Sequence, residues 1–369
     1  MEEWKQYNIG EICDTISETY KGNASDVVLI NTSDVLEGKC LNHTFVANKN
    51  LRGQFKKQFK KNDILYSEIR PANKRYAFID FESTDYIAST KLMVIRSNDK
   101  VLPKYLYYVL QSKEMVEVLQ MLAESRSGTF PQITFSELAI QTILLPEIRE
   151  QSKIVDFLES IDSKIALNRR INDNLEQQAQ ALFKSWFVEN ASYSGVSISE
   201  YFLPNRGKNL LVSDAKGGKT PVVAGGLTPS AFHNVANTKA PVITISASGA
   251  NAGFVNLWGI PVWAADSSYI DSTIVSNIYF WYNLLKYNQK NIYESQTGSA
   301  QPHIYPKHIG NLLIPDLDMR KVECYESIVA SMYLQINEIQ QETKFLSDLR
   351  DTLLPKLISG ELKINDLNC

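Results

Sequence analysis

The sequence is poor in cysteine and has no long apolar run. Its 369 residues include four cysteines, Cys13, Cys40, Cys324 and Cys369, and no two of them form a Cys-x-x-Cys pair. Neither a disulfide framework nor a zinc knuckle is indicated, so we expect reduced thiols. The N-terminus lacks the basic-then-apolar order of a signal peptide, and glycine, proline and polar residues interrupt the longest uncharged stretch, 240–265. We therefore expect a cytoplasmic protein with no membrane span.

A large excess of either charge is also missing. The net charge is −3, from 38 Lys and Arg and 41 Asp and Glu residues, which argues against a uniformly basic nucleic-acid coat. The acidic excess is confined to residues 147–191 and 316–369, whereas residues 192–315 have more cations than anions. This uneven distribution suggests that the chain is divided into domains.

Two segments have the heptad pattern of a coiled coil. Seam residues recur at alternating spacings of three and four over residues 151–186 and 322–357. The first seam consists of Gln151, Ile154, Leu158, Ile161, Ile165, Asn168, Asn172, Leu175, Ala179, Leu182 and Trp186. The second consists of Val322, Tyr325, Val329, Met332, Ile336, Ile339, Thr343, Leu346, Arg350, Leu353 and Leu357. Their equal lengths predict that two helices, each about 54 Å long at roughly 1.5 Å per residue, pair as an antiparallel coiled coil.

Two separate amphipathic helices, each lying on its own globular core, are the alternative interpretation. The matching length and register of the two seams favour the coiled coil. Pro146 and Pro315 precede the two segments and suit the entry to a helix, where the N–H group that proline lacks would have no partner. Gly360 follows the second segment and suits a helix stop.

The two halves of the chain repeat one local pattern. A Gly-containing loop precedes each helix, at 124–133 and again at 294–304, and an apolar strand ending in proline closes both copies. Short alternating strand patterns further upstream also correspond, 63–67 to 242–246 and 86–90 to 262–266. The pattern predicts a duplicated α+β architecture with small insertions.

The chain is longer than one domain core usually holds, at roughly 150 residues per domain. We therefore expect a first α+β domain at 1–146, a long helix at 147–191, a second α+β domain at 192–315, and a second long helix with a C-terminal tail at 316–369. Antiparallel pairing of the helices would separate the two domains by one to two turns of B-DNA, at about 34–36 Å per turn. A duplicated domain on such a spacer suits a bipartite linear ligand, and duplex DNA is the obvious candidate.

Four motifs, in this order, resemble a known family. They are LLPEIREQ at 144–151, LFKSWF at 182–187, GSAQPHI at 298–304 and LLPKLISGEL at 353–362. The chain resembles a specificity subunit of a type I restriction-modification system over nearly its whole length. One departure is that residues 315–321 lack the Glu-Gln pair expected there, which weakens the residue-level symmetry between the copies.

This resemblance implies that residues 1–146 and 192–315 are target recognition domains, related by a pseudo-twofold internal repeat and separated by the two long helices. It implies a non-catalytic subunit that recognises a bipartite, asymmetric DNA sequence with a fixed spacer. The expected partners are double-stranded DNA, two methyltransferase subunits and, for cleavage, translocating endonuclease subunits. No cofactor is expected on this chain.

The motifs of common enzymes support a non-catalytic role. Residues 216–220 imitate the end of a phosphate-binding loop, but Ser213 replaces its first glycine and Pro221 follows where a helix should begin. The methyltransferase motifs Asn-Pro-Pro-Tyr and Asp-Pro-Pro-Tyr are absent from the sequence. The Gly-rich stretch 247–253 lacks the strand-to-helix context of a cofactor loop, so we do not expect this chain to bind S-adenosylmethionine by itself.

Two groups of titratable residues have ordinary explanations. His303 and His308 are five residues apart in a loop or strand, which does not fit a helical metal pair, and we expect no metal site. Asp63, Glu68 and Arg70 could belong to a nuclease, but a lysine and a second acid are missing. An exposed strand edge is therefore the favoured interpretation of residues 63–70.

A basic run in the first domain is the clearest candidate for DNA contact. Its cations are Arg52, Lys56, Lys57, Lys60 and Lys61. Phe55 and Phe59 stand at helical spacing, so we expect a helix that is anchored by its apolar side and directs its cations outward. Lysines neutralise phosphates without recognising sequence, so phosphate contact is the natural role. A merely solvated face is the alternative.

The other candidate DNA-binding residues lie at turns and in the repeated loop. Arg70, Lys74 and Arg75 follow a strand at a Pro-Ala-Asn turn, and a guanidinium can bind guanine through two hydrogen bonds in the major groove. Polar side chains of the loop suit base edges or phosphates, and the alternative is that the loop only forms a turn. The loop candidates are Arg126, Thr129, Gln132, Gln296, Ser299, Gln301 and His303. The remaining candidates, in the second domain, are Lys216, Lys219, Ser246, Ser248 and Asn251.

Two other functions stand beside the DNA-specificity subunit. One is an autonomous coiled-coil DNA-binding scaffold or repressor that recruits no methyltransferase. The other, ranked below it, is a nuclease that uses Asp63 and Glu68. A methyltransferase gene beside this one would support the specificity subunit, and its absence would favour the scaffold.

Overall fold

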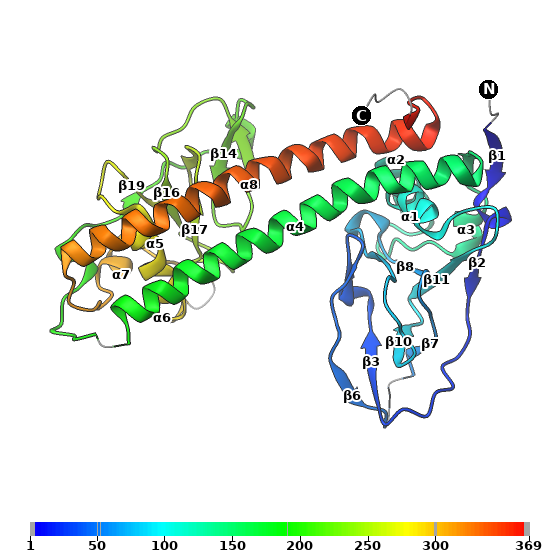
Figure 1. The fold of residues 1–369 in the computed structure, drawn as a ribbon, viewed down its shortest axis with the longest axis horizontal. Coiled ribbons are helices and arrows are strands. Elements are labelled where there is room, and N and C mark those ends of the chain that lie inside the picture. Colours follow the sequence, from blue (N-terminus) through cyan, green and yellow to red (C-terminus); the bar gives the residue numbers. More distant parts are fainter. Residues whose placement is uncertain (1–3, 50, 52, 190, 299–300, 365–369) are drawn as a thin grey trace. The chain divides into compact units, whose positions relative to one another are not determined.

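The structure is a computed structural model that describes residues 4–49, 51, 53–189, 191–298 and 301–364. Of the predicted site residues, Arg52 and Ser299 lie outside the described residues. The chain forms two compact units, unit 1 (Met1–Lys164 and Phe345–Cys369) and unit 2 (Ile165–Lys344). Both units mix helices and sheets, as predicted (Figure 1).

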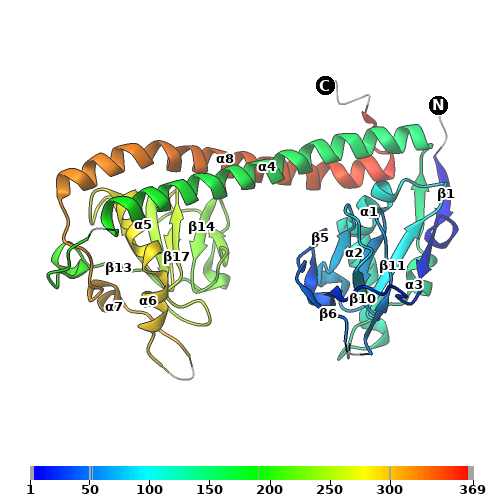
Figure 2. The ribbon, with the colours of Figure 1, turned by 60° about the horizontal axis from the view of Figure 1, so that its bottom comes forward.

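Two long helices run through the fold. Helix α4 (Ile148–Phe187) has 40 residues and helix α8 (Met319–Ser359) has 41, and the two lie side by side (Figures 1 and 2). Every predicted seam position of both helices is buried or half-buried. The heptad periodicity of the sequence therefore identified the contact face of each helix.

Hydrogen bonds between the helices show their direction. In unit 1, Arg350 Nη1 donates to Asp162 Oδ1 at 2.9 Å. In unit 2, Asn168 Nδ2 donates to Glu342 Oε2 at 2.8 Å, and further along α4, Lys321 Nζ donates to Trp186 O at 2.6 Å. The partner number on α8 falls as the number on α4 rises, so the predicted antiparallel pairing is confirmed.

The helix ends differ in part from the expectation. Pro146 and Pro315 both lie before the first helical residue of α4 and α8, so the expectation that they open the helices is wrong. The carbonyl of Pro146 instead accepts a hydrogen bond from the buried side chain of Gln151, at 2.9 Å. Gly360 directly follows α8 with φ of +76°, a left-handed conformation that ends many helices, so the predicted stop is confirmed.

Unit 1 contains two four-stranded sheets. The first is antiparallel, in the order β2 (Cys13–Ile16), β11 (Leu92–Ser97), β8 (Ile64–Ser67) and β9 (Tyr76–Phe78). The second has the order β6 (Phe45–Ala47), β3 (Asp26–Ile30), β10 (Tyr86–Ser89) and β7 (Phe55–Lys57), and its β3 and β10 are parallel. Two short pairs complete the strands, β1 (Lys5–Asn8) with β12 (Thr142–Leu145) and β4 (Val35–Leu36) with β5 (Lys39–Cys40). The short helices are α1 (Pro103–Gln111), α2 (Lys113–Arg126) and α3 (Phe135–Ala139).

Unit 2 is built from a similar set of elements. Its first sheet has the order β13 (Asn205–Arg206), β19 (Ser267–Asp271), β16 (Val242–Ser246) and β17 (Val255–Trp258), all antiparallel. Its second has the order β15 (Ala231–His233), β14 (Thr220–Val223) and β18 (Trp263–Ala264), and its β14 and β18 are parallel. The short helices are α5 (Ile278–Tyr287), α6 (Gln289–Glu294) and α7 (Pro306–Gly310).

The two units share one strand topology. The order β2-β11-β8-β9 matches β13-β19-β16-β17, and β6-β3-β10 matches β15-β14-β18 with the same parallel pair. Strand β7 has no counterpart among the described strands of unit 2. The duplication inferred from the sequence is thus a duplication of the fold.

The long helices also contribute to the core of each unit. In unit 1, Ile154 and Leu158 of α4 are 1% and 0% exposed. They belong to an apolar cluster that also contains buried residues of α1 and α2. In unit 2, Phe183 and Phe187 lie four residues apart on α4, and their rings are 5.8 and 5.0 Å from that of Phe280 on α5. Phe183 and Phe187 are not seam residues, so this part of α4 carries a second apolar stripe that packs on the globular part of unit 2.

Candidate nucleic-acid interface

The turn after β8 in unit 1 and the turn after β16 in unit 2 have matching backbone hydrogen bonds. Glu68 N donates to Lys91 O at 3.0 Å, and Ala247 N donates to Asp266 O at 3.1 Å. Glu68 is therefore equivalent to Ala247, and Lys91 to Asp266. The sequence comparison placed Thr90 opposite Asp266, one residue away. In unit 1 the pairing of β10 with β7 shifts register between Ala88 and Ser89. Such an irregularity accommodates one extra residue, which accounts for the difference of one residue.

The same two turns also pair with the repeated loop. Arg70 N donates to Pro131 O and Gly249 N donates to Pro302 O, both at 3.1 Å. Arg70 is therefore equivalent to Gly249. The residue after each proline forms a β-bridge with the turn, Gln132 with Ile69 in unit 1 and His303 with Ser248 in unit 2. Gln132 is therefore equivalent to His303. The repeated loop and the strand-end turn thus meet in both units, and together they form the candidate interface.

The turn in unit 1 contains two strained residues. Arg70 and Lys74 have φ of 45° and 53°, in the left-handed region. The β8–β9 and β16–β17 registers make Lys74 equivalent to Gly253, and Gly249 and Gly253 have φ of 81° and 87°. A residue with a β-carbon pays roughly 1–2 kcal/mol in this conformation, whereas glycine does not. Unit 1 therefore keeps two cationic side chains at positions where glycine would be less strained.

Three predicted residues of unit 1 come together at this interface. Arg70 Nη2 donates to Thr129 O at 3.4 Å, and the amide oxygen of Gln132 accepts a hydrogen bond from Lys91 Nζ at 3.1 Å. Lys91 also lies 3.6 Å from a carboxylate oxygen of Glu68. Sequence reasoning missed Lys91. Its position directly after the alternating strand 86–90 was the only signal that could have identified it.

Three other predicted cations of unit 1 have structural partners. Arg75 is half-buried, and its Nη1 donates to Ser33 O at 3.0 Å. Arg126 Nη1 lies 3.0 and 3.1 Å from the two carboxylate oxygens of Glu137. Lys74 is exposed and forms an ion pair of 3.4 Å with Glu37. Arg75 and Arg126 hold loops in place, which makes direct base contact by either a weaker proposal.

The basic run does not form the expected helix. Residues 55–57 form edge strand β7 and a turn follows, so the helical interpretation is wrong. Lys56, Lys60 and Lys61 are exposed, but Lys57 Nζ donates to Leu92 O at 2.8 Å, and burial lowers the pKa of Lys57. Phe55 and Phe59 have the spacing of one helix face, but residues 55–57 pair with β10 as a strand. Side chains of a strand alternate between its two faces, so the helical spacing has no effect here.

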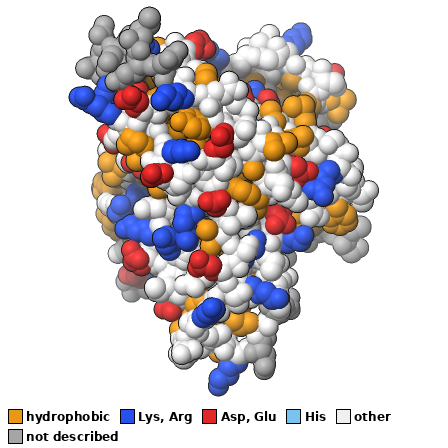
Figure 3. Space-filling view, turned by 90° about the vertical axis from the view of Figure 1, so that its right-hand side faces the viewer, with side chains coloured by type: hydrophobic (Ala, Val, Ile, Leu, Met, Phe, Trp, Pro, Cys, Tyr) orange, Lys and Arg blue, Asp and Glu red, His pale blue; other side chains and the backbone are white. Residues whose placement is uncertain are grey.

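Basic side chains are mixed with acidic ones on the surface. On the face drawn in Figure 3, Lys and Arg side chains lie among Asp, Glu and hydrophobic side chains. Independently of that view, Lys61 of unit 1 lies 3.9 Å from Glu82, with both side chains largely exposed. This face agrees with the absence of a uniformly basic coat that the net charge indicated.

The carboxylates that suggested a nuclease are held by cations. Asp63 is 1% exposed, and Arg96 binds it with Nε and Nη2, each at 2.7 Å from a carboxylate oxygen. Strand β8 lies inside its sheet, so the expectation of an exposed strand edge is wrong. Glu68 faces Lys91, as described above. Asp63 is therefore a core residue whose charge is neutralised by Arg96.

The equivalent cluster of unit 2 has different chemistry. Ser248 Oγ donates to the carboxylate of Asp266, and Arg206 Nη2 lies 3.7 Å from the same carboxylate. The Arg206 guanidinium lies over the ring of Tyr305 at 5.6 Å, and His303 stacks on that ring with centroids 6.0 Å apart. Sequence reasoning found Ser248 and His303 but missed Arg206, Asp266 and Tyr305, which come from distant strands and loops.

The remaining candidates of unit 2 are partly structural. Ser246 is 4% exposed, with its hydroxyl directed at Ala224 O, so it does not reach the surface. Gln296 Nε2 donates to Ala252 O at 2.7 Å. The other described candidates are exposed or half-buried: Lys216, Lys219, Asn251 and Gln301. Lys216 and Lys219 precede strand β14 and not a helix, which agrees with the rejection of a phosphate-binding loop.

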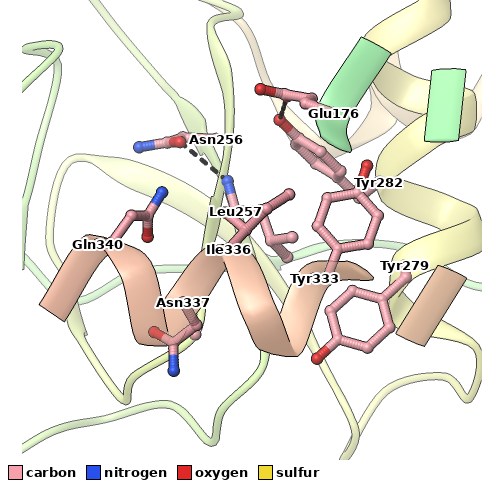
Figure 4. A pocket seen from close by; sticks show the side chains of 10 residues that line it. Glu176, Asn256, Leu257, Tyr279, Tyr282, Tyr333, Ile336, Asn337 and Gln340 are labelled. Carbon is pink, nitrogen blue, oxygen red and sulfur yellow. Dashed lines mark hydrogen bonds between the residues drawn. The ribbon is translucent and has the colours of Figure 1, made fainter. Parts of the chain in front are cut away.

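A cavity of about 70 Å³ lies in unit 2 between α4, α8, α5 and β17 (Figure 4). Its lining includes Tyr279, Tyr282 and Tyr333, and Tyr282 Oη donates to Glu176 at 2.5 Å. Small-molecule pockets usually measure roughly 300–1,000 Å³, so this cavity is too small for a nucleotide-sized cofactor. Among the described residues, no three His, Cys, Asp or Glu side chains gather as metal ligands, and no helix is long and apolar enough to cross a membrane.

Comparison with known proteins finds a DNA specificity domain and several similar specificity subunits. Residues 1–177 match the family model described as "Type I restriction modification DNA specificity domain". Residues 1–177 therefore contain a type I restriction-modification DNA specificity domain, and the chain is similar to the specificity subunits of these systems. It is 47% identical over 232 residues to the HindI specificity subunit of Haemophilus influenzae, in an alignment that covers 60% of this chain and 49% of that one. The match therefore spans about half the length of that relative.

Two more distant specificity subunits align over more of their own length. The chain is 25% identical over 323 residues to the MjaIX specificity subunit of Methanocaldococcus jannaschii, covering 73% of this chain and 71% of that one. The crystal structure of a type I restriction-modification S subunit from M. genitalium superposes with a TM-score of 0.59 at 22% identity, covering 96% of both chains. The superposition shows that the fold is shared, and the resemblance found from the sequence motifs is confirmed.

Proposed function

We propose that this chain is a type I restriction-modification specificity subunit, which recognises a bipartite, asymmetric DNA sequence and gathers two methyltransferase subunits, with endonuclease subunits added for cleavage. The observation that carries the proposal is the duplicated interface. Two units with one backbone topology present different polar groups at equivalent positions. Such a pair of modules suits two different half-sites on one DNA molecule, and no observation favours the autonomous scaffold or repressor.

The candidate interface and the exposed lysines elsewhere in unit 1 suit a division of labour on DNA. Exposed lysines such as Lys56 and Lys60 bind phosphates, which supplies affinity without sequence preference. Arginine, glutamine and carboxylate side chains form specific hydrogen bonds with base edges in the major groove. Arg70, Gln132 and Asp266 are the strongest candidates for that second role, because they lie where the strand ends meet the repeated loop.

We also propose that the chain is non-catalytic by itself. The acids considered for nuclease chemistry, Asp63 and Glu68, are paired with Arg96 and Lys91. The methyl groups would come from the methyltransferase subunits, and the strand breaks from endonuclease subunits.

The paired helices are proposed to set the spacer between the half-sites. Helices α4 and α8 are continuous over 40 and 41 residues, or about 60 Å each at roughly 1.5 Å per residue. A helix pair resists bending far better than a loop of the same number of residues. The division into target recognition domains at 1–146 and 192–315 is part of the same proposal.

Methylome sequencing tests the proposed function. A host that carries this gene and its methyltransferase gene should contain methylated bases in one bipartite motif with a fixed spacer. The motif should disappear when this gene alone is deleted. A methylome that is unchanged by the deletion would contradict the proposal and return the scaffold to consideration.

A further inference from the structure

The two units differ in charge at equivalent positions of the interface. Unit 1 has Arg70, Lys74 and Lys91 where unit 2 has Gly249, Gly253 and Asp266, as established by the shared backbone hydrogen bonds and strand registers. At the third pair, a donor side chain is replaced by an acceptor. The side chain of Lys91 is 50% exposed and that of Asp266 is 35% exposed, so solvent and a ligand can reach both.

Backbone strain indicates that the Arg70 side chain has a role beyond the fold. The turn needs a left-handed residue at this position, and unit 2 meets that need with Gly249. Arg70 holds φ of 45° instead, and the one hydrogen bond of its guanidinium among the described residues is 3.4 Å long. A residue that is strained and contributes little to packing is typical of a ligand-binding position. Most of the donors of this exposed guanidinium therefore face solvent.

The available partners in DNA distinguish donors from acceptors. In the major groove guanine presents two acceptors, N7 and O6, which a guanidinium binds with two hydrogen bonds. A carboxylate accepts from the exocyclic amino group of cytosine or adenine, and it is repelled by the acceptors of guanine. Ser248 and Arg206 hold the Asp266 carboxylate in place, so it can act as a fixed acceptor.

We infer that the two units recognise base edges of opposite hydrogen-bonding character, with Arg70 binding guanine in the half-site of unit 1 and Asp266 binding an amino group in the half-site of unit 2. This inference rests on the proposed function, because it assigns the bases that each unit contacts. It gives a physical reason for an asymmetric site. Two modules with one backbone then require different sequences.

The test replaces each residue within the complete complex. Arg70→Gly gives unit 1 the residue of unit 2 and relieves the backbone strain, so a loss of specificity would not reflect misfolding. Asp266→Asn keeps the size of the side chain and adds donors. Asn62→Gly is the matched control, because Asn62 is exposed and left-handed with φ of 72° but lies outside the interface. Each variant is co-expressed with the methyltransferase, and the methylated sites are sequenced.

Arg70→Gly should relax a guanine requirement in one half-site, reducing discrimination roughly 5- to 150-fold at that base pair, and leave the other half-site as it was. Asp266→Asn should relax a cytosine or adenine position in the other half-site, and Asn62→Gly should methylate the wild-type motif. If Arg70→Gly keeps the full wild-type motif, or if both half-sites change together, the inference is wrong.

Two further outcomes are distinguishable. If the wild-type complex produces no bipartite motif, the proposed function itself has failed. If Arg70→Gly abolishes methylation, competition binding of the wild-type complex to duplexes changed at single base pairs decides the question. A wild-type complex that binds every duplex altered at a guanine of the unit 1 half-site equally well would overturn the inference.

Discussion

At the strand-end turns, the two units keep two buried residues and change several exposed ones. Ser67 and Ser246 occupy equivalent strand ends and are 2% and 4% exposed, and Ile133 and Ile304 are equivalent and buried. At the surface of the same turns, arginine is replaced by glycine and lysine by aspartate. The difference teaches that burial and backbone hydrogen bonds maintain the topology, while the solvent-facing positions of the strand-end turns are free to diverge.

Lengthening the helix pair should have the largest effect. We expect it to change the distance between the two proposed half-sites and to leave the sequence of each half-site unchanged. One heptad is inserted into each helix, after Leu175 and between Ile336 and Ile339, which preserves both seams and adds roughly 10 Å. DNA rises about 3.4 Å per base pair, so the spacer of the methylated motif should grow by about three base pairs, or less if the DNA bends.

Both half-site sequences should remain as in the wild type, and modification of the original motif should be lost. The experiment is again methylome sequencing, with a single insertion in α4 as the control that breaks the pairing. An unchanged spacer at full activity would mean that the helices do not set the distance.

A buried ion pair should make unit 1 more sensitive to substitution than unit 2. Arg96→Ala leaves Asp63 charged and without its partner at 1% exposure, which should lower the free energy of unfolding by about 3–5 kcal/mol. Unit 2 has Val242 and Asp271 at the equivalent positions, so it has no such pair. Urea denaturation followed by tryptophan fluorescence and circular dichroism measures the change.

Lys61→Ala is the control for the ion pair, because Lys61 and Glu82 are exposed and 3.9 Å apart. Exposed pairs contribute about 0–1 kcal/mol, so this variant should unfold nearly as the wild type does. A similar loss in both variants would show that the burial of Asp63 is not the cause.

Lysine substitutions at the edge of unit 1 should have a smaller and unspecific effect on DNA binding. Replacing Lys56, Lys60 and Lys61 with alanine removes three exposed cations, and each phosphate contact contributes about 0.9 to the slope of log affinity against log salt concentration. Affinity for cognate and random duplexes should fall by the same factor, measured by fluorescence anisotropy over a salt series. Lys57 is left in place because its ammonium group holds the carbonyl of Leu92. An unaltered slope would assign these lysines to a merely solvated face.

The smallest effect is expected from Glu68→Ala. Neither the purified wild-type chain nor this variant should cleave DNA. The purified chain should neither nick DNA in magnesium nor transfer methyl groups, because Asp63 and Glu68 are already paired with Arg96 and Lys91. Nicking that survives purification and disappears in Glu68→Ala would establish a nuclease activity instead.

Local patterns in the sequence were sufficient for the long helices and for the repeat. The spacing of Ile154, Leu158 and Ile161 is a property of neighbouring residues, and burial in the structure follows it. The same holds for Gly360, whose left-handed conformation ends α8. The order of motifs along the chain was also sufficient for the resemblance to type I specificity subunits.

The roles of individual site residues could not be obtained in this way. Lys56 and Lys57 are neighbours in one basic run, yet one is exposed and the other is bound to a carbonyl 35 residues away. Phe55 and Phe59 have helical spacing but belong to strand β7 and the loop after it, because the ladder with β10 overrides local periodicity.

The sequence alone therefore determined the heptad helices, the duplication and the family resemblance, since each depends on periodicity or order along the chain. The tertiary structure decided which side chains meet, because Glu68, Lys91 and Gln132 are distant in sequence. Strand pairing and backbone hydrogen bonds bring them close enough for their side chains to interact. It also decided that Asp63 is buried and that Lys91 is equivalent to Asp266. The folded backbone determines which charged residues become neighbours, and no pattern of residues close in sequence predicts these pairs.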